Sequence, residues 1–374
     1  MKIEKSLKLD LLDLPEDKYF VSFSEDFNED LVKQFKAKFY PLMKNCKRAI
    51  GILDSSFSTF HRKNQYPLYV ISRMVEKLDL GNSELHNNLI RLRTWGHSIN
   101  IKPRFPIILS KGLARILAHL FGDGVLCMDK RNLLRSTYYN QERVLREEFK
   151  KDMSKIFGIK SFHESINKTT NFVSVPTSAS WALYQIIPDF NGKSCRIPPF
   201  IKGASYEIKK SFIRAFFDDE SHVCYKPPHR YIEIGLNNKS FLKDLKTLVE
   251  GFGINATKIY RKTLRGFDFY YFYIRHFHNL LKYSKEIGFI HPKKKNKLST
   301  ILKNPGRKHY SSGETEKRIL NAIGDGLKTS TEISKAINRK RVTTNHFLNK
   351  LEQKKKLKRV TLKREGIIWR VNNG

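Results

Sequence analysis

The sequence has few cysteines, and none of them are paired by spacing. Its four cysteines, Cys46, Cys127, Cys195 and Cys224, lie far apart, and no Cys-x-x-Cys motif occurs. This spacing argues against a zinc ribbon and against a disulfide framework. A reducing cytoplasm is the location that we expect.

Long apolar segments are also missing. No run approaches the roughly 18 apolar residues that a membrane-spanning helix requires. Residues 1–20 carry charges among their apolar positions and lack the apolar core of a signal peptide. We therefore expect a soluble protein that has no membrane partner.

Acidic residues are scarce relative to basic ones. Lysine and arginine number 71 against 36 acidic residues, which gives a net charge of +35 that is spread along the whole chain. Such an excess predicts a polyanionic partner, because each phosphate neutralised by a basic side chain releases condensed counterions. An acidic membrane is the alternative polyanion, but no basic amphipathic segment or acylation motif supports it. Nucleic acid is the expected partner.

Two apolar helical segments in the sequence each end in acidic residues. The first, KGLARILAHLFGDGVL, runs over residues 111–126 and places Asp123 between two glycines. The second, KSFIRAFFDDESHV, runs over residues 210–223 and ends in an acidic triplet whose last member, Glu220, lies 97 positions after Asp123. The strand and helix patterns that follow each segment occur in the same order, with Asn140-Gln141 and Asn237-Asn238 at the same offset. The chain therefore contains an internal duplication with a unit of about 95 residues.

A duplicated helix that ends in an acid suggests two helices packed as a pseudo-two-fold pair. Ala118, Gly122 and Ala215 supply small residues at helical spacing for close packing, whereas Asp219 stands where another small residue is expected. Two carboxylates held close together repel each other unless a cation lies between them. Carboxylates that hold Mg²⁺ are suited to phosphodiester hydrolysis. The alternative for each helix alone is a buried core helix whose terminal acid lies in solvent.

The two segments LARILAHLFGDG and FIRAFFDDES resemble the paired motifs of single-chain LAGLIDADG homing endonucleases of the DOD type, which also occur inside inteins. The resemblance covers residues 107–302 and implies an α+β fold with two pseudo-symmetric αββαββα repeats. Each repeat would place a curved antiparallel sheet along the DNA major groove, with the motif helices at the seam. It also implies a protein that acts as a monomer.

The resemblance implies roles for individual residues. Asp123 and Glu220 fall on the catalytic ligands of Mg²⁺ or another divalent cation, and Asp218 on a capping aspartate. Gln141 and Asn238 fall on positions that orient water near the scissile phosphate, but neither is basic. The water-activating lysine is therefore sought at Lys193 or in the run Lys293 to Lys295, with Lys294 as its central member; the alternative for that run is a solvated phosphate-binding loop. Asp219 and Ser221 depart from the family pattern in the second motif.

The predicted strands alternate apolar residues with polar and basic ones, so that one face can pack on helices while the other contacts base edges and phosphates. The residues of the repeats expected to bind DNA are Arg135, Tyr139, Asn140, Arg230, Asn237, Lys258, Arg261, Lys262 and Arg275.

Two further regions flank the repeats, which we assign to residues 106–203 and 204–303. Residues 1–105 form a mainly helical region, either a DNA-contacting module with Arg91 and Arg93 on a helix or a cap over the following domain. Residues 314–374 resemble a winged helix-turn-helix domain with three helices and a two-stranded wing. That resemblance implies DNA contacts from Arg339, Arg341, Thr343, Thr344, Asn345, Lys350, Lys363 and Arg364.

The function predicted from the sequence is metal-dependent, site-specific cleavage of double-stranded DNA. One alternative is a non-catalytic transcription regulator built on a LAGLIDADG-like domain with a helix-turn-helix domain. Another is an RNA-splicing maturase, whose partner would be intron RNA. The presence of both Asp123 and Glu220 favours the enzyme. The chain ends, with no initial Cys or Ser and no terminal His-Asn, argue against a complete self-splicing intein.

Overall fold

A computed structural model describes residues 7–39, 49–95, 99–130, 133–167, 169–188, 190, 194–264, 266–304, 312–326, 329–362 and 366–372. The fold is mixed α+β, and the chain divides into two compact units, residues 1–302 and 303–374. The finer division of the first unit into three domains stays a prediction. None of the helices in the described ranges is long and apolar enough to cross a membrane.

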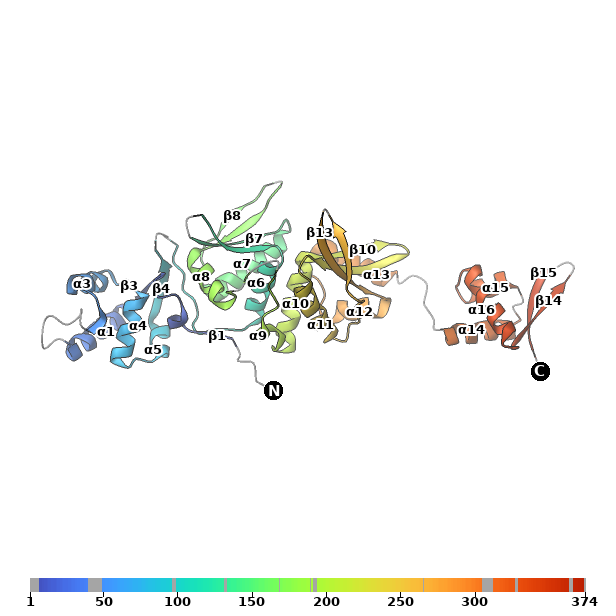
Figure 1. Cartoon of the computed structure of the whole chain (residues 1–374), viewed down its shortest axis with the longest axis horizontal. Helices are drawn as coiled ribbons and strands as arrows, with labels where there is room; N and C mark the ends of the chain where they lie inside the picture. Colours follow the sequence, from blue (N-terminus) through green and yellow to red (C-terminus); the bar gives the residue numbers. More distant parts are fainter. Residues whose placement is uncertain are drawn as a thin grey trace. The chain divides into compact units, whose positions relative to one another are not determined.

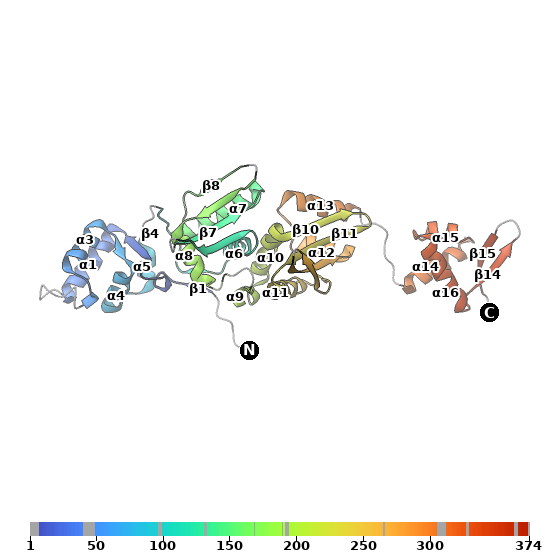
Figure 2. The ribbon, with the colours of Figure 1, turned by 45° about the horizontal axis from the view of Figure 1, so that its top comes forward.

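The centre of the first unit contains the element order αββαββα twice. The first set is α6 (Lys111–Phe121), β6 (Gly124–Met128), β7 (Leu134–Tyr139), α7 (Arg143–Phe157), β8 (His163–Ser165), β9 (Phe172–Val175) and α8 (Thr177–Ile186). After α9 (Pro199–Lys202), the second set is α10 (Tyr206–Glu220), β10 (Ser221–Lys226), β11 (His229–Leu236), α11 (Lys239–Glu250), β12 (Tyr260–Leu264), β13 (Phe267–Arg275) and α12 (Phe277–Glu286). The antiparallel sheets have matching strand orders, β6-β7-β9-β8 and β10-β11-β13-β12. Both sheets lie over the same side of the helices (Figures 1 and 2).

Helices α6 and α10 pack against each other between the two sheets (Figure 1). Helix α6 begins where the Ser110 hydroxyl accepts a hydrogen bond of 3.2 Å from the backbone N–H of Leu113. Close approach near its end depends on Gly122, because a Cβ there would lie 3.0 Å from the Cβ of Asp219. The seam between the halves is therefore narrowest beside the acidic residues.

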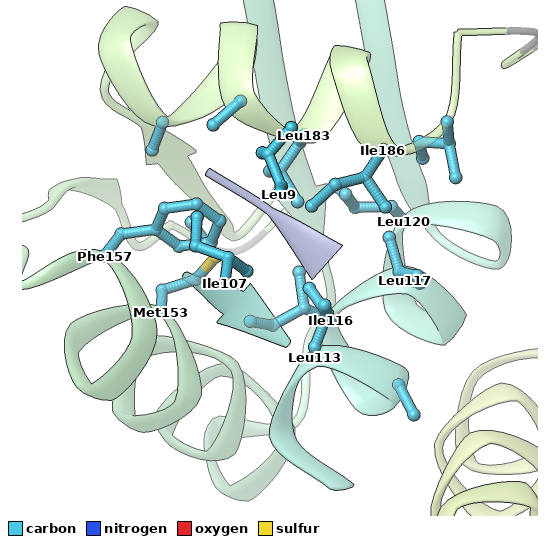
Figure 3. Close-up of a cluster of buried hydrophobic side chains, with 14 of the residues drawn as sticks. Leu9, Ile107, Leu113, Ile116, Leu117, Leu120, Met153, Phe157, Leu183 and Ile186 are labelled. Carbon is cyan, nitrogen blue, oxygen red and sulfur yellow. The ribbon is translucent and has the colours of Figure 1, made fainter. Parts of the chain in front are cut away.

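The core of the first half includes residues from the N-terminal segment. Strands β1 (Lys8–Leu9) and β5 (Ile107–Ile108) pair antiparallel, with Leu9 opposite Ile107. Figure 3 shows these two residues among buried side chains of α6, α7 and α8, including Leu117, Met153 and Leu183. Burying apolar surface of this kind contributes roughly 25 cal/mol per Å². The N-terminal segment is thus part of the first half's core.

The N-terminal region combines helices with a small sheet. Its elements are η1 (Leu11–Asp13), β2 (Tyr19–Phe23), α1 (Glu25–Phe39), α3 (Asp54–Lys63), β3 (Tyr66–Pro67), α4 (Leu68–Leu78), α5 (Asn82–Asn88) and β4 (Leu89–Thr94), with strand order β3-β2-β4. The expectation that Arg91 and Arg93 lie on a helix is wrong. Residues 89–94 pair with β2, so Arg91 and Arg93 lie on a strand. Tyr19 donates a hydrogen bond to the backbone carbonyl of Ser178, which joins this region to α8.

The segment after β13 also differs from the expectation. The lysine run, for which a solvated phosphate-binding loop was the alternative, forms the first turn of α13 (Pro292–Lys303). Leu298 and Ile301 anchor this helix in the core of the first unit. The lysines are therefore presented from a helix instead of a loop.

The second unit contains three helices followed by a β-hairpin. They are α14 (Ser312–Gly324), α15 (Ser330–Ala336), α16 (Arg341–Gln353), β14 (Leu357–Leu362) and β15 (Gly366–Val371). Thr329 and Glu332 form a capping box at the start of α15. Ile319, Ile333 and Leu348 belong to a separate hydrophobic core. The element order agrees with the predicted one, and the winged-helix assignment stays a prediction.

We expect Gly124→Ala to destabilise the first unit strongly. The chain turns from α6 into β6 so tightly that a Cβ on Gly124 would lie 2.4 Å from the Cα of Leu120, so backbone has to move. The expected loss is roughly 2–4 kcal/mol in the free energy of unfolding, measured by urea titration. Gly81→Ala is the control, because a Cβ there meets only the Ser83 hydroxyl at 3.7 Å; it should cost less than about 1 kcal/mol. Equal losses in the two variants would contradict the prediction.

Candidate functional site

The acids of the two motifs come together at the ends of α6 and α10. Asp123 follows α6 directly, and Glu220 is the last residue of α10. Burial and the charge of Asp219 raise the pKa of Asp123 to about 6. Burial, Asp123 and Asp219 raise the pKa of Glu220 to about 7. Near neutral pH the Glu220 carboxyl is thus only partly ionised, and a bound cation would favour its ionised form.

Asp219 lies at the centre of a buried polar network. Its side chain has no exposed surface, and His119 Nδ1 lies 2.8 Å from its Oδ2. The Tyr138 hydroxyl donates to its Oδ1 at 2.7 Å, and Asn140 Nδ2 approaches the same oxygen at 3.2 Å. Asn140 Nδ2 also donates to Asp123 Oδ2 at 2.9 Å. Asn140 therefore links the buried aspartate of α10 to the acid that follows α6.

His119 is buried in α6 beneath the acids. Burial by itself would lower the pKa of His119, but Asp219 and Glu148 outweigh it and raise that pKa to about 9. Glu148 Oε2 lies 3.6 Å from His119 Nε2, and Arg115 and Arg214 also pair with Glu148. A charged histidine is therefore held between carboxylates of α7 and α10.

Asp218 joins the end of α10 to the start of α13. Its side chain has no exposed surface and accepts backbone hydrogen bonds from Ile290 at 3.1 Å and His291 at 3.0 Å. These residues immediately precede α13, so Asp218 fixes the segment that leads into that helix. The capping role that the resemblance implies for Asp218 stays a prediction.

Lys294 covers the C-terminal end of α10. Its ammonium donates to the backbone carbonyls of Phe217 at 3.0 Å, Asp218 at 2.6 Å and Asp219 at 3.0 Å. A cation is favourable there, because the last carbonyls of a helix carry partial negative charge. Burial lowers the pKa of Lys294, which the surrounding acids oppose. All three donors of the ammonium are used inside the protein, which does not favour a solvated phosphate-binding role.

The other residues predicted to orient or activate water lie in different surroundings. Gln141 is exposed near Asp123, and its Nε2 donates to the carbonyl of Thr169 at 2.8 Å. Asn238 is buried; its Oδ1 caps α11 by accepting from the N–H of Phe241 at 3.0 Å, and its Nδ2 donates to the carbonyl of Cys195 at 2.8 Å. Lys193 lies outside the described residues. Asn140, which was expected to bind DNA, donates a hydrogen bond to Asp123 Oδ2 at 2.9 Å.

Residues 207–288 match the family model of a LAGLIDADG-like domain. The matched segment begins in α10, contains Glu220 and ends after α12. Its limits correspond to the second half of the central region of the first unit.

Curated relatives are matched over short parts of their length. The chain is 27% identical over 229 residues to a replication factor C small subunit of Thermococcus kodakarensis, covering 60% of this chain and 25% of that protein. It is 25% identical over 237 residues to a glutamine–fructose-6-phosphate aminotransferase of Methanocaldococcus jannaschii, covering 60% of this chain and 21% of that protein. The chain thus spans a quarter or less of the length of these relatives.

Solved structures with similarity include two LAGLIDADG proteins. The crystal structure of I-DmoI in complex with DNA and Mn has 15% sequence identity and a TM-score of 0.38, and the match covers 48% of this chain and 97% of that one. The full-length DUF199/WhiA structure from Thermotoga maritima has 15% identity and a TM-score of 0.35, and the match covers 65% and 90% of the two chains.

The residues expected to bind DNA lie on different faces of the two sheets. Arg135 and Tyr139 are exposed on β7, while Asn140, Asn237 and Lys258 lie outside the strands. Strand alternation places Lys262 and Arg275 on the solvent face of the second sheet. The same alternation places Arg230 and Arg261 on the opposite face, where Arg261 pairs with Asp268 at 2.8 Å. Those two arginines therefore do not share the solvent face with Lys262.

In the second unit, Arg341 is exposed at the start of α16. The expectation that Thr344 contacts DNA is wrong. Its side chain has no exposed surface, and its hydroxyl donates to the carbonyl of Lys340 at 3.2 Å. Thr343, Asn345 and Arg339 are partly buried, and Lys350 pairs with Glu316 at 3.2 Å. Lys363 and Arg364 lie outside the described residues. Val342 and His346 are exposed on α16, four residues apart, and were not predicted to contact DNA. Helical spacing from Arg341 places them on nearby faces of the helix.

We expect the charged form of His119 to stabilise the fold in a defined pH range. Its pKa is about 9 in the folded protein against an ordinary value of 6.5, so the stabilisation is complete below about pH 6.5 and is lost as pH rises through 9. The wild-type free energy of unfolding should fall between pH 7.5 and 9.5 by roughly 1–3 kcal/mol more than that of His119→Gln, measured by urea titration. His163→Gln, at an exposed histidine of β8, should retain the wild-type pH dependence. Parallel pH curves for wild type and His119→Gln would contradict the prediction.

Proposed function

We propose that this protein is a site-specific, metal-dependent endonuclease that cleaves double-stranded DNA and acts as a monomer. The observation that carries the proposal is the convergence of Asp123 and Glu220 at the seam between α6 and α10. The net charge of +35 supports a nucleic-acid partner, and the LAGLIDADG-like match over residues 207–288 supports the type of domain.

The donor atoms at the seam fit a hard cation. Within the described residues, the Asp123 side chain has a single bond, from Asn140, and Glu220 has neither a hydrogen bond nor an ion pair. Asp219 is occupied by its three partners, and the described part of the chain holds no group of three metal-binding side chains. Mg²⁺ is commonly bound by one or two carboxylates, with water and phosphate oxygens completing its shell, whereas zinc sites require three or four protein ligands. Asp123 and Glu220 would therefore hold Mg²⁺ or a similar ion.

The chain's own residues prepare this pair for phosphodiester hydrolysis. A bound divalent ion would neutralise charge on the phosphate and make water more acidic. Asn140 donates to one oxygen of Asp123, so the other oxygen would be available to a cation. Lys294 lowers the pKa of both Asp123 and Glu220 from behind the end of α10. These contacts partly offset the burial that raises the pKa of both carboxyls.

Two surface depressions flank the acids, and each contains one of them. One is lined by Asp123, Asn140, Gln141 and Lys293, and the other by Glu220, Gly124, Cys127 and Asn237. A site that cleaves both strands of a duplex needs a separate position for each scissile phosphate. One acid in each depression favours double-strand cleavage with the acids acting as a pair.

The matches to curated relatives support the presence of an independent module in this chain, and they do not support any one of those relatives' activities. Replication factor C, an aminotransferase and an RNA polymerase subunit have unrelated activities, and the chain matches 25% or less of each. A segment similar to all three is better explained by an independent nucleic-acid-processing module than by any of their functions. The alternatives of a transcription regulator or a maturase share the fold, and they differ in lacking cleavage or in preferring RNA.

Asp123→Asn and Glu220→Gln should each reduce Mg²⁺-dependent cleavage of a randomised-site plasmid library by about 10²-fold or more, because each removes a charged cation ligand. DNA binding without added metal should change by less than about three-fold, since neither substitution removes a basic contact. Glu250→Gln, at an exposed acid of α11, is the matched control and should cleave like wild type.

The outcome separates the proposed functions. Specific binding by wild type with no Mg²⁺-dependent cleavage would refute the nuclease and favour the regulator. Much stronger competition by intron-like RNA than by duplex DNA would favour the maturase.

We further propose that α16 contacts DNA phosphates through Arg341. Arg341→Gln should weaken duplex binding and reduce the slope of log K against log salt by about one, because one phosphate contact is lost. Thr344→Ser is the control, because that side chain is buried and should not alter the slope. Fluorescence anisotropy over a salt series measures both values. An unchanged slope for Arg341→Gln would show that this residue does not contact phosphate.

A further inference from the structure

The solvent side of the second sheet carries a continuous array of aromatic rings. Along β13, Phe272 and Ile274 are buried, whereas the residues that alternate with them face solvent and are partly exposed. Neighbouring strands add a ring on each side through the β11–β13 and β12–β13 pairings. The members of this aromatic face are Tyr231, Tyr260, Phe269, Tyr271 and Tyr273.

The rings contact one another across three strands. The ring centroids of Tyr260 and Tyr271 are 5.5 Å apart, and those of Tyr271 and Tyr273 are 5.4 Å apart. Tyr231 meets Tyr273 at 4.7 Å. Adjacent strands are spaced about 4.8 Å apart, so the array is wide enough for two or three nucleobases.

A glycine keeps the array close to the sheet. Gly235 of β11 lies opposite Tyr271, and a Cβ on it would fall 2.4 Å and 2.5 Å from two atoms of the Phe269 ring. The Phe269 ring therefore lies over bare backbone. Because Gly235 has no side chain, the Phe269 ring can lie directly against the strand at this point.

Basic groups border the same face. The Lys262 ammonium lies 4.8 Å from the ring centroid of Phe269 and 4.9 Å from that of Tyr271, and the Lys258 ammonium lies 5.6 Å from that of Tyr260. Glu233 also faces this side, and it lies 3.9 Å from Lys262. Cations beside aromatic rings suit a ligand that alternates phosphates with flat bases.

The first sheet has a different solvent face. At its matching positions β7 presents Arg135, Thr137 and Tyr139, and β9 presents Phe172 and Ser174. Tyr139 and Phe172 are in ring contact at 5.7 Å, and His163 meets Phe172 at 5.8 Å. The two halves share strand order but offer different chemistry to a nucleic acid.

This difference bears on what the second sheet can bind. A duplex presents base edges in its grooves and keeps the base faces stacked inside, whereas an unpaired strand exposes those faces. We propose that the aromatic face stacks on unpaired bases of single-stranded nucleic acid, with Lys258 and Lys262 on the adjoining phosphates. The site is separate from the acid pair, so the proposal does not require the nuclease function.

The test compares full-length variants on single strands and on a duplex. Labelled oligonucleotides of about 12 nucleotides are prepared as RNA, as DNA and as the corresponding duplex, and binding is followed by fluorescence anisotropy without added metal. Tyr271→Ala and Tyr260→Ala should each weaken single-strand binding by at least about five-fold and change duplex binding by less than about two-fold. Tyr271→Phe keeps the ring and should bind like wild type. A comparison of the RNA and DNA affinities then shows which kind of single strand the aromatic face prefers.

A control variant and a crosslinking experiment distinguish loss of the aromatic ring from misfolding. Tyr206→Ala removes an exposed ring of α10, outside the sheet, and should leave single-strand binding unchanged. Photocrosslinking of wild type with a 5-iodouracil-containing strand should label the peptide that carries Tyr271. Equal loss of duplex and single-strand binding, unchanged binding by both alanine variants, or crosslinks confined to other elements would each overturn the proposal.

Discussion

The contact between His119 and Asp219 is the interaction on which the rest of the site depends. Removing two charges from water costs several kcal/mol for each ion, and their attraction offsets this only when further hydrogen bonds complete the arrangement. Tyr138 and Asn140 supply those bonds to Asp219. We therefore infer that the pair adds little net stability compared with an apolar contact, and that its main effect is to fix α10 against α6. That register places Glu220 beside Asp123.

The same seam concentrates negative charge. Asp123, Asp218, Asp219 and Glu220 lie close together, and the nearest cations, His119 and Lys294, are both bonded inside the protein. Burial, together with the neighbouring acids, raises the pKa of Asp123, Asp218 and Glu220. The oxygens of Asp218 accept backbone hydrogen bonds, whereas Glu220 has no hydrogen bond among the described residues and Asp123 has one, from Asn140. A ligand cation would therefore gain most at these two residues, and both of them border surface depressions.

The sequence predicted most of the central region because its signals are local. The alternation in β6 and β7 and the apolar stripe of α6 depend on neighbouring residues. The same local patterns recur 97 positions later, which made the duplication visible. The features that the sequence did not predict depend on contacts between residues far apart in the chain. LIRLRT has apolar positions compatible with helix or strand, and pairing with β2 selects the strand. The segment that leads into α13 is held by Asp218, which is more than 70 positions away. His119 in an apolar helix was a visible signal, but its partner Asp219 lies across the seam.

Asp219 and Ser221 give the second motif a different role from the first. Asp219 occupies a place where a small residue was expected, and the missing side chain of Gly122 provides the space for it. The Ser221 hydroxyl donates to the carbonyl of Phe217 at 2.6 Å and so helps to close the end of α10. Through Asn140, Asp219 supports Asp123, while Glu220 has no hydrogen bond among the described residues. The two acids are thus not equivalent: the fold positions Asp123 in advance, whereas Glu220 can adjust to a bound ligand.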